Sequence, residues 1–274
     1  MKLKKADKVI VILSITFCIV SSGAYLLFEE LGIIIGLGLL VFVLMKYQNY
    51  NKNLIYNDLQ RVKNDYYQLE SLINIYQIIE VGKPIPALRK FAASPDFMRE
   101  LFKIIDTHQP KVILELGSGV SSILIGYLLK QRQEGKLITI DHDEKFGSQT
   151  MANVRYHGLE DVVEVRIAPF RSYTLNQEKY IWYDEDLLTL EQKIDLLIVD
   201  GPPVFEEFVS RYPALPLLID RMAEGSLTIM DDASRTTEKE IKKRWLKEFP
   251  HLCETSIETE KGMAILSRQK PPSL

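Results

Sequence analysis

Residues 112–122 read VILELGSGVSS, and the rest of the chain is interpreted outward from them. The segment 112–116 is apolar apart from one acid, which predicts a buried strand. Gly117 and Gly119 then allow a tight turn in which the backbone comes close to a ligand. The run 121–130 (SSILIGYLLK) predicts a helix whose first N–H groups face the turn. Strand, glycine turn and helix in this order are typical of the first unit of a nucleotide-binding α/β fold.

Two features separate this stretch from a dinucleotide fingerprint. Ser122 stands where the third glycine would fall, and Glu115 lies two residues before the first glycine. The sequence Glu-Leu-Gly-Ser-Gly resembles motif I of class I S-adenosylmethionine (SAM) methyltransferases, whose loop passes beneath the cationic methionine part of SAM. On spacing alone, a turn without a ligand stays an alternative. The residues that the resemblance assigns to SAM are Glu115, Gly117, Ser118 and Gly119.

Length, charge and cysteine content limit the number of domains, the kind of partner and the cellular compartment. The 274 residues suffice for one α/β domain of about 180 residues and an appendage. A net charge of -3 gives no indication of nucleic-acid binding. Cys18 and Cys253 lie far apart and form no disulfide framework, which fits a reducing compartment. No histidine has a partner at zinc-ligand spacing.

The N-terminal segment predicts a membrane anchor. Residues 9–28 form an apolar run of 20 residues, long enough to span a bilayer, and 31–45 form a second run of 15. Glu29 and Glu30 separate the runs, so we expect a transmembrane helical hairpin rather than one helix. Lysines flank both outer ends, which places the hairpin in the cell (inner) membrane with the catalytic domain facing the cytoplasm. A cleaved signal peptide and a re-entrant second run are the alternatives.

A polar helix is expected to follow the anchor. Its apolar residues keep the 4-3 spacing of a coiled-coil seam, which would make a homo-oligomer through residues 48–80. A single helix that lays this stripe on the catalytic domain is the alternative. We therefore expect three parts: a hairpin (1–47), a helical linker (48–83) and a catalytic domain (84–274). The seam consists of Ile55, Leu59, Val62, Tyr66, Leu69, Ile73 and Tyr76.

After the glycine turn, strands and helices alternate, which predicts a doubly wound parallel sheet. The last two strands, 253–259 and 262–267, have too short a connection for a parallel crossover and predict an antiparallel hairpin. A Rossmann-like sheet that ends in such a hairpin resembles the class I methyltransferase fold over residues 90–268. The other predicted strands are 137–141, 163–168, 194–200 and 226–230.

Ligands of open α/β sheets bind at the carboxyl ends of the strands. Asp141 ends the second strand, where an acid can accept both ribose hydroxyls and where the methyltransferase family has one. Its alternative is a helix N-cap. His142 is expected to face the nucleotide. The resemblance places Ala168 and Pro169 near the adenine pocket.

Three acids follow the next two strands: Asp200, Asp231 and Asp232. Converging carboxylates repel unless something positive lies among them, and Mg²⁺ or another divalent cation prefers oxygen ligands. The set resembles metal-dependent O-methyltransferases of the catechol and macrocin type, but Pro203 stands where the catechol enzymes have their lysine base. Capping helices or binding the SAM amino group are the alternatives. Without a metal, Asp200 is the first candidate for the general base.

The segment 171–192 is a long insertion with four aromatic residues: Tyr173, Tyr180, Trp182 and Tyr183. A lid over the substrate and a loop packed on its own domain are equally compatible with it.

The sequence thus predicts a membrane-anchored, SAM-dependent O-methyltransferase whose acceptor is a hydroxyl on a glycan, a lipid-linked molecule or a small molecule. An NAD-dependent Rossmann oxidoreductase and a non-catalytic membrane scaffold are the alternatives.

Overall fold

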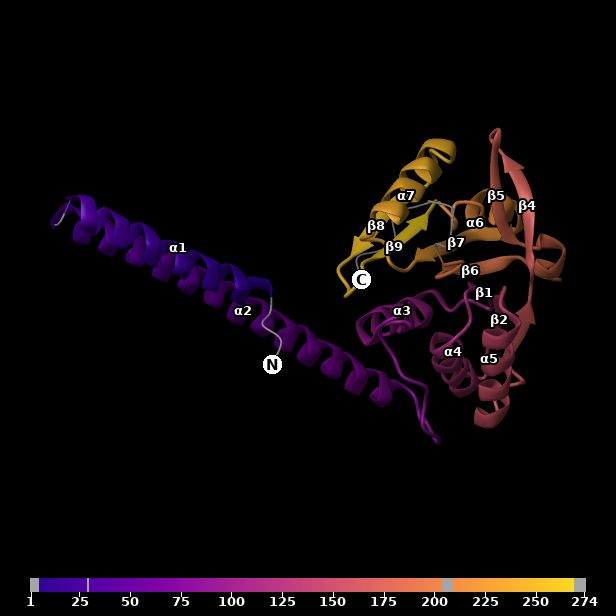
Figure 1. Ribbon diagram of the computed structural model, residues 1–274. Coiled ribbons are helices and arrows are strands. Elements are labelled where there is room, and N and C mark those ends of the chain that lie inside the picture. Colours follow the sequence, from indigo (N-terminus) through magenta and orange to yellow (C-terminus); the bar gives the residue numbers. More distant parts are fainter. Residues whose placement is uncertain (1–4, 29, 204–208, 269–274) are drawn as a thin grey trace. The chain divides into compact units, whose positions relative to one another are not determined.

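The computed structural model describes residues 5–28, 30–203 and 209–268 (Figure 1). Contacts divide the chain into two compact units, Met1–Tyr66 and Tyr67–Leu274. This division falls inside the predicted 48–83 linker. Each unit is described by itself.

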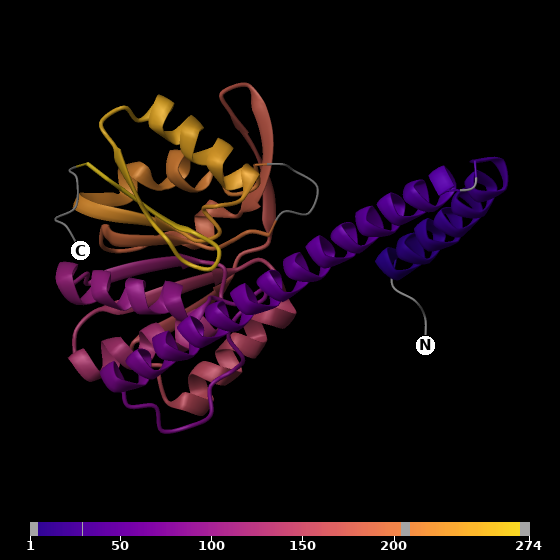
Figure 2. The same cartoon turned by 90° about the vertical axis from the view of Figure 1, so that its left-hand side faces the viewer.

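The first unit consists of α1 (Lys5–Phe28) and most of α2 (Glu30–Ile78). Position 29 between them lies outside the described residues, and the two helices run antiparallel side by side (Figures 1 and 2). A Cβ at Gly36 would lie 3.2 Å from the Ser21 hydroxyl, so the missing side chain allows close packing. Ile12, Ile34 and Leu37 are more than half exposed, which gives the pair an apolar outer surface. One helix of the described part, Gly32–Ile78, contains a stretch long and apolar enough to cross a membrane.

The end of α2, from Tyr67 on, belongs to the second unit and packs inside it through a face other than the predicted seam. Ile75 and Ile79 are buried in its core, and the Gln68 side-chain oxygen accepts a hydrogen bond from the Asp96 N–H at 3.1 Å. Leu69 and Ile73, which belong to the seam, are 55% and 52% exposed. At these two positions the stripe does not lie on the catalytic domain.

The second unit is built on a seven-stranded sheet with the order β3-β2-β1-β6-β7-β9-β8. The first five of these strands are parallel, and β9 pairs antiparallel with both β7 and β8. This arrangement confirms the predicted doubly wound fold with a terminal hairpin. The strands are β1 (Val112–Leu116), β2 (Lys136–Asp141), β3 (Val163–Ile167), β6 (Ile194–Val199), β7 (Met222–Met230), β8 (Cys253–Ile257) and β9 (Met263–Ser267).

Helices cover both faces of the sheet (Figure 1). Successive residues of a strand point to opposite sides, and both sets are apolar, so each face must be buried. In β6, Leu196 and Ile198 belong to one core cluster, and Leu197 and Val199 to the other. The first cluster packs under α3 (Pro95–His108), α4 (Val120–Arg132) and α5 (Glu144–His157). The second packs under α6 (Ala214–Leu218), the short helix η2 (Ile219–Arg221) and α7 (Thr236–Glu248).

The insertion after β3 forms a separate two-stranded hairpin, β4 (Phe170–Leu175) with β5 (Glu178–Tyr183), followed by the short helix η1 (Glu185–Leu188). Tyr180, Trp182 and Tyr183 are buried in the second core cluster. Of the two interpretations of this segment, the structure shows the packed one.

Candidate functional site

The carboxyl ends of β1, β2, β6 and β7 bring the predicted site residues to one edge of the sheet, as parallel pairing requires. Gly117 has φ +100°, and a Cβ there would lie 3.1 Å from the Gly201 backbone nitrogen. The turn after β1 thus crosses the end of β6 so closely that only glycine fits. Around Gly119, by contrast, a Cβ would meet no described atom within 4 Å, so a ligand can approach the backbone there.

Asp141 is joined directly to the glycine turn. The Ser118 hydroxyl donates to Asp141 Oδ2 at 2.6 Å, and Asp141 Oδ1 accepts the Asp143 N–H at 3.0 Å. The N-cap of α5 is Asp143, whose carboxylate accepts from the backbone N–H groups of Lys145 and Phe146. The capping alternative for Asp141 is therefore wrong. A carboxylate has about four acceptor positions, which leaves capacity for ribose hydroxyls.

Glu115 lies behind the turn. Its side chain is completely buried, its carboxylate accepts a hydrogen bond from the Ser122 hydroxyl, and that hydroxyl in turn accepts the Gly119 N–H at 3.1 Å. Burial raises the pKa of Glu115. The structure corrects the expectation that Glu115 meets SAM directly, because the side chain has no exposed surface. Through Ser122 it orders the glycine turn instead.

An aromatic stack borders Asp141. The rings of His142 and Phe170 are parallel with centroids 4.2 Å apart. Ala168 is buried and donates its N–H to the Asp141 carbonyl oxygen at 2.7 Å, while Pro169 next to it is exposed. The residues predicted for the nucleotide thus lie together. Sequence reasoning missed Phe170, whose only signal is that it follows Pro169.

The three acids after β6 and β7 converge as predicted, with one oxygen of each within 4.8 Å of the others. The side chains of Asp231 and Asp232 are 0% and 3% exposed, whereas that of Asp200 is 16% exposed. Burial raises the pKa of Asp200 to about 7, with Asp232 adding to the shift and Arg211 opposing it. Burial, together with Asp200 and Asp232, raises the pKa of Asp231 to about 8.

Arg211, which sequence reasoning missed, lies among these acids. Its side chain is 3% exposed, and Nη2 donates to Asp232 Oδ2 at 2.9 Å and to the Asp200 carbonyl oxygen at 2.7 Å. Nη1 donates to the Asp231 carbonyl oxygen at 3.0 Å. Arg211 thus supplies the positive charge that the carboxylates require. The three carboxylates, with Arg211 bonded among them, do not fit a divalent cation. The only signal in the sequence is a basic residue between the strand-end acid and the next helix.

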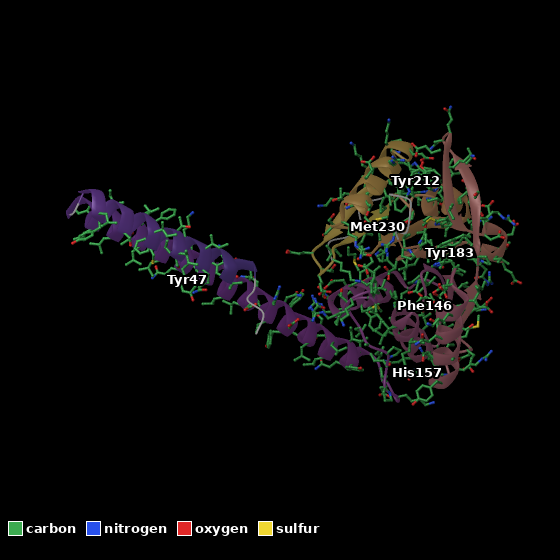
Figure 3. All side chains as sticks on the ribbon, viewed as in Figure 1. Tyr47, Phe146, His157, Tyr183, Tyr212 and Met230 are labelled. Atoms are coloured by element: carbon green, nitrogen blue, oxygen red, sulfur yellow. The ribbon has the colours of Figure 1, made fainter. Side chains whose placement is uncertain are left out.

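Tyr183 is a buried residue that lies beside the end of β6. It ends β5 inside the domain, where Figure 3 labels it together with Met230, the last residue of β7. Its hydroxyl lies so close to Gly201 that a Cβ there would collide with it. Within the described part of the chain this buried hydroxyl has no hydrogen-bond partner. The aromatic hairpin thus contributes one polar atom to the strand-end region.

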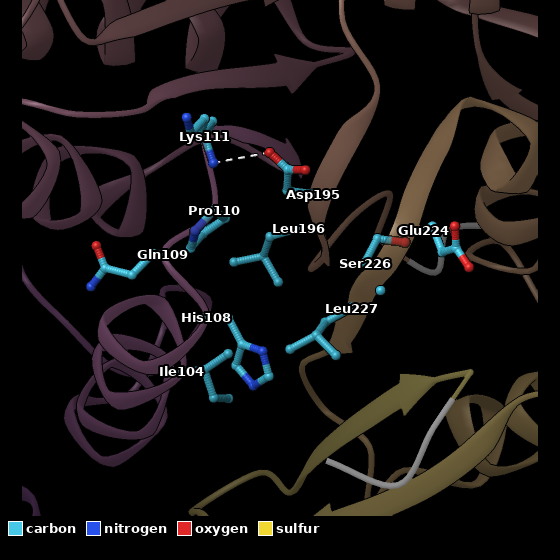
Figure 4. A pocket seen from close by; sticks show the side chains of 11 residues that line it. Ile104, His108, Gln109, Pro110, Lys111, Asp195, Leu196, Glu224, Ser226 and Leu227 are labelled. Carbon is cyan, nitrogen blue, oxygen red and sulfur yellow. Dashed lines mark hydrogen bonds between the residues drawn. The ribbon is translucent and has the colours of Figure 1, made fainter. Parts of the chain in front are cut away.

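A separate hollow of about 230 Å³ lies at the opposite edge of the sheet (Figure 4). Its wall includes His108, Glu224 and Asp195, and Asp195 accepts the Lys111 N–H at 2.9 Å. This hollow is at the amino ends of β1, β6 and β7. Because ligands of such sheets bind at the carboxyl ends, we do not assign the chemistry to it.

Comparison with known proteins identifies the kind of domain that carries these residues. The profile of a family described as "Methyltransferase domain" matches residues 114–233, which run from β1 past the paired acids. The chain is similar in structure to the SAH-bound methyltransferase PaMTH1 of Podospora anserina, with 15% identity, a TM-score of 0.55, and 78% of this chain and 97% of that one covered. It is also similar to the SAM-bound O-methyltransferase TomG of Streptomyces achromogenes, involved in tomaymycin synthesis, with 15% identity, a TM-score of 0.50, and 73% and 88% covered. No curated protein sequence matches the chain.

Residues 114–233 thus match a methyltransferase domain, and the sheet that contains them has the class I SAM-dependent methyltransferase fold. The chain is thus a SAM-dependent methyltransferase with an additional N-terminal helical unit.

Proposed function

We propose that this enzyme is an O-methyltransferase that holds SAM at residues 117–119 and Asp141 and places an acceptor hydroxyl beside Asp200. The observation that carries the proposal is the meeting of these three groups at one edge of the sheet. Asp200 is the only one of the three clustered acids with a side chain exposed above 3%. It is therefore the acid that a substrate can reach.

Methyl transfer from a sulfonium is a direct displacement, so the protein mainly holds donor and acceptor in line and excludes water. An acceptor hydroxyl must lose its proton as the new bond forms. The raised pKa of Asp200, about 7, suits a general base near neutral pH. Arg211 keeps this side chain in place through the carbonyl and carboxylate oxygens of the same residue.

We propose that α1 and the first part of α2 anchor the enzyme in the cell (inner) membrane. Large apolar side chains on the outside of this helical pair would be unfavourable in water and are typical of a lipid-facing surface. An anchored enzyme meets acceptors at the membrane. The acceptor class that we propose is therefore a hydroxyl on a lipid-linked or other glycan, or on a small molecule of the envelope.

The test is incubation of membranes that contain the full chain with methyl-labelled SAM, followed by identification of the labelled product. We expect the label in a methyl ether, which is stable to base. Asp200→Asn should lose the labelling and retain its affinity for SAM. Lys193→Gln, an exposed change at the other edge of the sheet, serves as the control with normal labelling. Label on nitrogen or carbon would contradict O-methylation, and a thermal shift with NAD but not with SAM would overturn the donor assignment.

A further inference from the structure

Arg211 connects the ends of two neighbouring strands. One guanidinium nitrogen, Nη2, bonds the backbone of Asp200 and the side chain of Asp232, and lies 3.4 Å from Asp200 Oδ1. The other, Nη1, bonds the backbone of Asp231. A buried guanidinium with this many acceptors is fixed in position, and it keeps its charge at all accessible pH values.

Two further cations lie beside the acids. Arg235 Nη2 lies 2.8 Å from Asp232 Oδ1, and Lys261 Nζ lies 3.8 Å from Asp231 Oδ2. Glu238 adds a fourth carboxylate, 3.8 Å from Arg211 Nη1. Three cations of the chain therefore face four carboxylates. A divalent ion among them would displace Arg211 from its acceptors or lie beside it against like charge.

We infer that the Arg211 guanidinium takes the place of a divalent cation in this site, so that methyl transfer here proceeds without a bound metal. This inference rests on the proposed function. A guanidinium cannot act as a Lewis acid on the acceptor oxygen, so removal of the proton falls to the Asp200 carboxylate alone. As the O–CH₃ bond forms, the S–CH₃ bond breaks, the acceptor proton passes to Asp200, and neutral S-adenosylhomocysteine leaves. Arg211 is a positioning residue in this scheme.

The test titrates the full-length protein in detergent, after dialysis against EDTA, with Mn²⁺ by calorimetry and paramagnetic resonance in the presence of SAM. We expect the wild-type protein to show no stoichiometric Mn²⁺ site and to keep its methyl transfer in EDTA. One Mn²⁺ per chain, lost in Asp231→Asn, would overturn the inference. Because SAM binding is measured in the same samples, failure of the donor site is seen separately from failure of this inference.

A second arm tests Arg211 itself. Arg211→Ala leaves the carboxylates without their buried cation, so we expect it to bind Mn²⁺ at least about tenfold more tightly than the wild-type protein. Arg244→Ala is the matched control, because Arg244 pairs with Glu178 and Glu240 instead of these acids, and its Mn²⁺ titration should equal that of the wild type. A folded Arg211→Ala protein that gains no Mn²⁺ site would contradict the role of Arg211. If this variant does not fold, the wild-type titration decides alone.

Discussion

At the scale of single residues, Asp141 carries the clearest prediction about SAM. Its carboxylate is held by Ser118 and by the Asp143 N–H in the region where the ribose is expected. We expect Asp141→Ala to weaken SAM binding by about 2–3 kcal/mol, because two charge-assisted hydrogen bonds are lost. Calorimetry measures this directly.

Asp143→Ala provides the matched comparison two residues away. It removes the cap of α5 and should lower the stability of the protein by about 1 kcal/mol while SAM affinity stays close to normal. Equal SAM affinity in wild type and Asp141→Ala would refute the ribose role.

The strand-end acids predict how stability depends on pH. The pKa values of Asp200 and Asp231 are raised to about 7 and about 8, above their ordinary value near 3.8. Between the ordinary and the raised pKa values, the folded protein keeps protons that the unfolded chain has released. The free energy of unfolding therefore falls as the pH rises through this range. We expect the melting temperature of the ligand-free protein to fall between about pH 5 and 8 through these two groups.

Asp200→Asn tests this assignment. The variant removes one of the two groups and also the charge that helps to raise the pKa of Asp231. Its melting temperature should therefore fall less steeply with pH than that of the wild type. Parallel profiles for the two proteins would show that other groups set the pH dependence.

Single residues also show which parts of the site a sequence can reveal. Asp141 was predictable because it ends a strand at a recognisable distance from the glycine turn. Glu115 was expected to meet SAM, whereas its side chain is buried in β1, because spacing does not tell how deeply a side chain is buried. Arg211 was missed because its contacts with Asp231 and Asp232 come from chain folding over about 20 residues and leave no local pattern.

At the scale of elements, the β4–β5 hairpin is a part of the core and not a free lid. Trp182 is completely buried, whereas Ile181 beside it is 46% exposed. We expect Trp182→Ala to destabilise the protein by about 3–5 kcal/mol, the usual loss for a large buried aromatic side chain. Ile181→Ala in the same strand should change stability by less than about 1 kcal/mol. Similar melting curves for both variants would contradict the packed hairpin.

This hairpin is also the element that the sequence did not predict. The alternating strands and helices of the main sheet have long apolar runs, and the structure confirms them from β1 to β9. The hairpin instead turns at Asn176 and Gln177, both with positive φ, and lacks the glycine that usually marks such a turn. Its burial follows from tertiary packing, which local patterns do not contain.

The seam on α2 carries a prediction about assembly. Ile55, Leu59 and Val62 are 69%, 61% and 64% exposed, although their spacing is that of a coiled coil. We propose that a second copy of the chain covers this stripe, because a heptad seam is complementary to itself. Leu59→Glu should therefore convert a dimer into a monomer in detergent, as measured by light scattering, with little effect on monomer stability.

Gln60→Glu adds the same charge one position outside the seam and should leave the dimer intact. A monomer for the wild-type chain, or equal masses for both variants, would contradict this pairing.

At the scale of the whole molecule, charge predicts the orientation of the chain in the membrane. Lys2, Lys4, Lys5 and Lys8 precede the first apolar run, Lys46 and Lys52 follow the second, and the acidic pair lies between the runs. By the positive-inside rule, we expect both basic ends to stay in the cytoplasm. Reporter fusions at residue 50 and at the C-terminus should both report the cytoplasm, and a tag near residue 30 should report the far side.

Replacing the four N-terminal lysines by glutamine tests the cause of this orientation. If the basic residues set it, the residue-50 fusion should lose part of its cytoplasmic signal, whereas glutamine at Lys63, outside the apolar runs, should change nothing. The catalytic domain needs SAM, which is made in the cytosol, so orientation and activity are linked. A C-terminal reporter on the far side would therefore contradict both the hairpin and the proposed enzyme. A residue-30 tag on the cytoplasmic side would contradict only the spanning hairpin and would leave the methyltransferase site untouched.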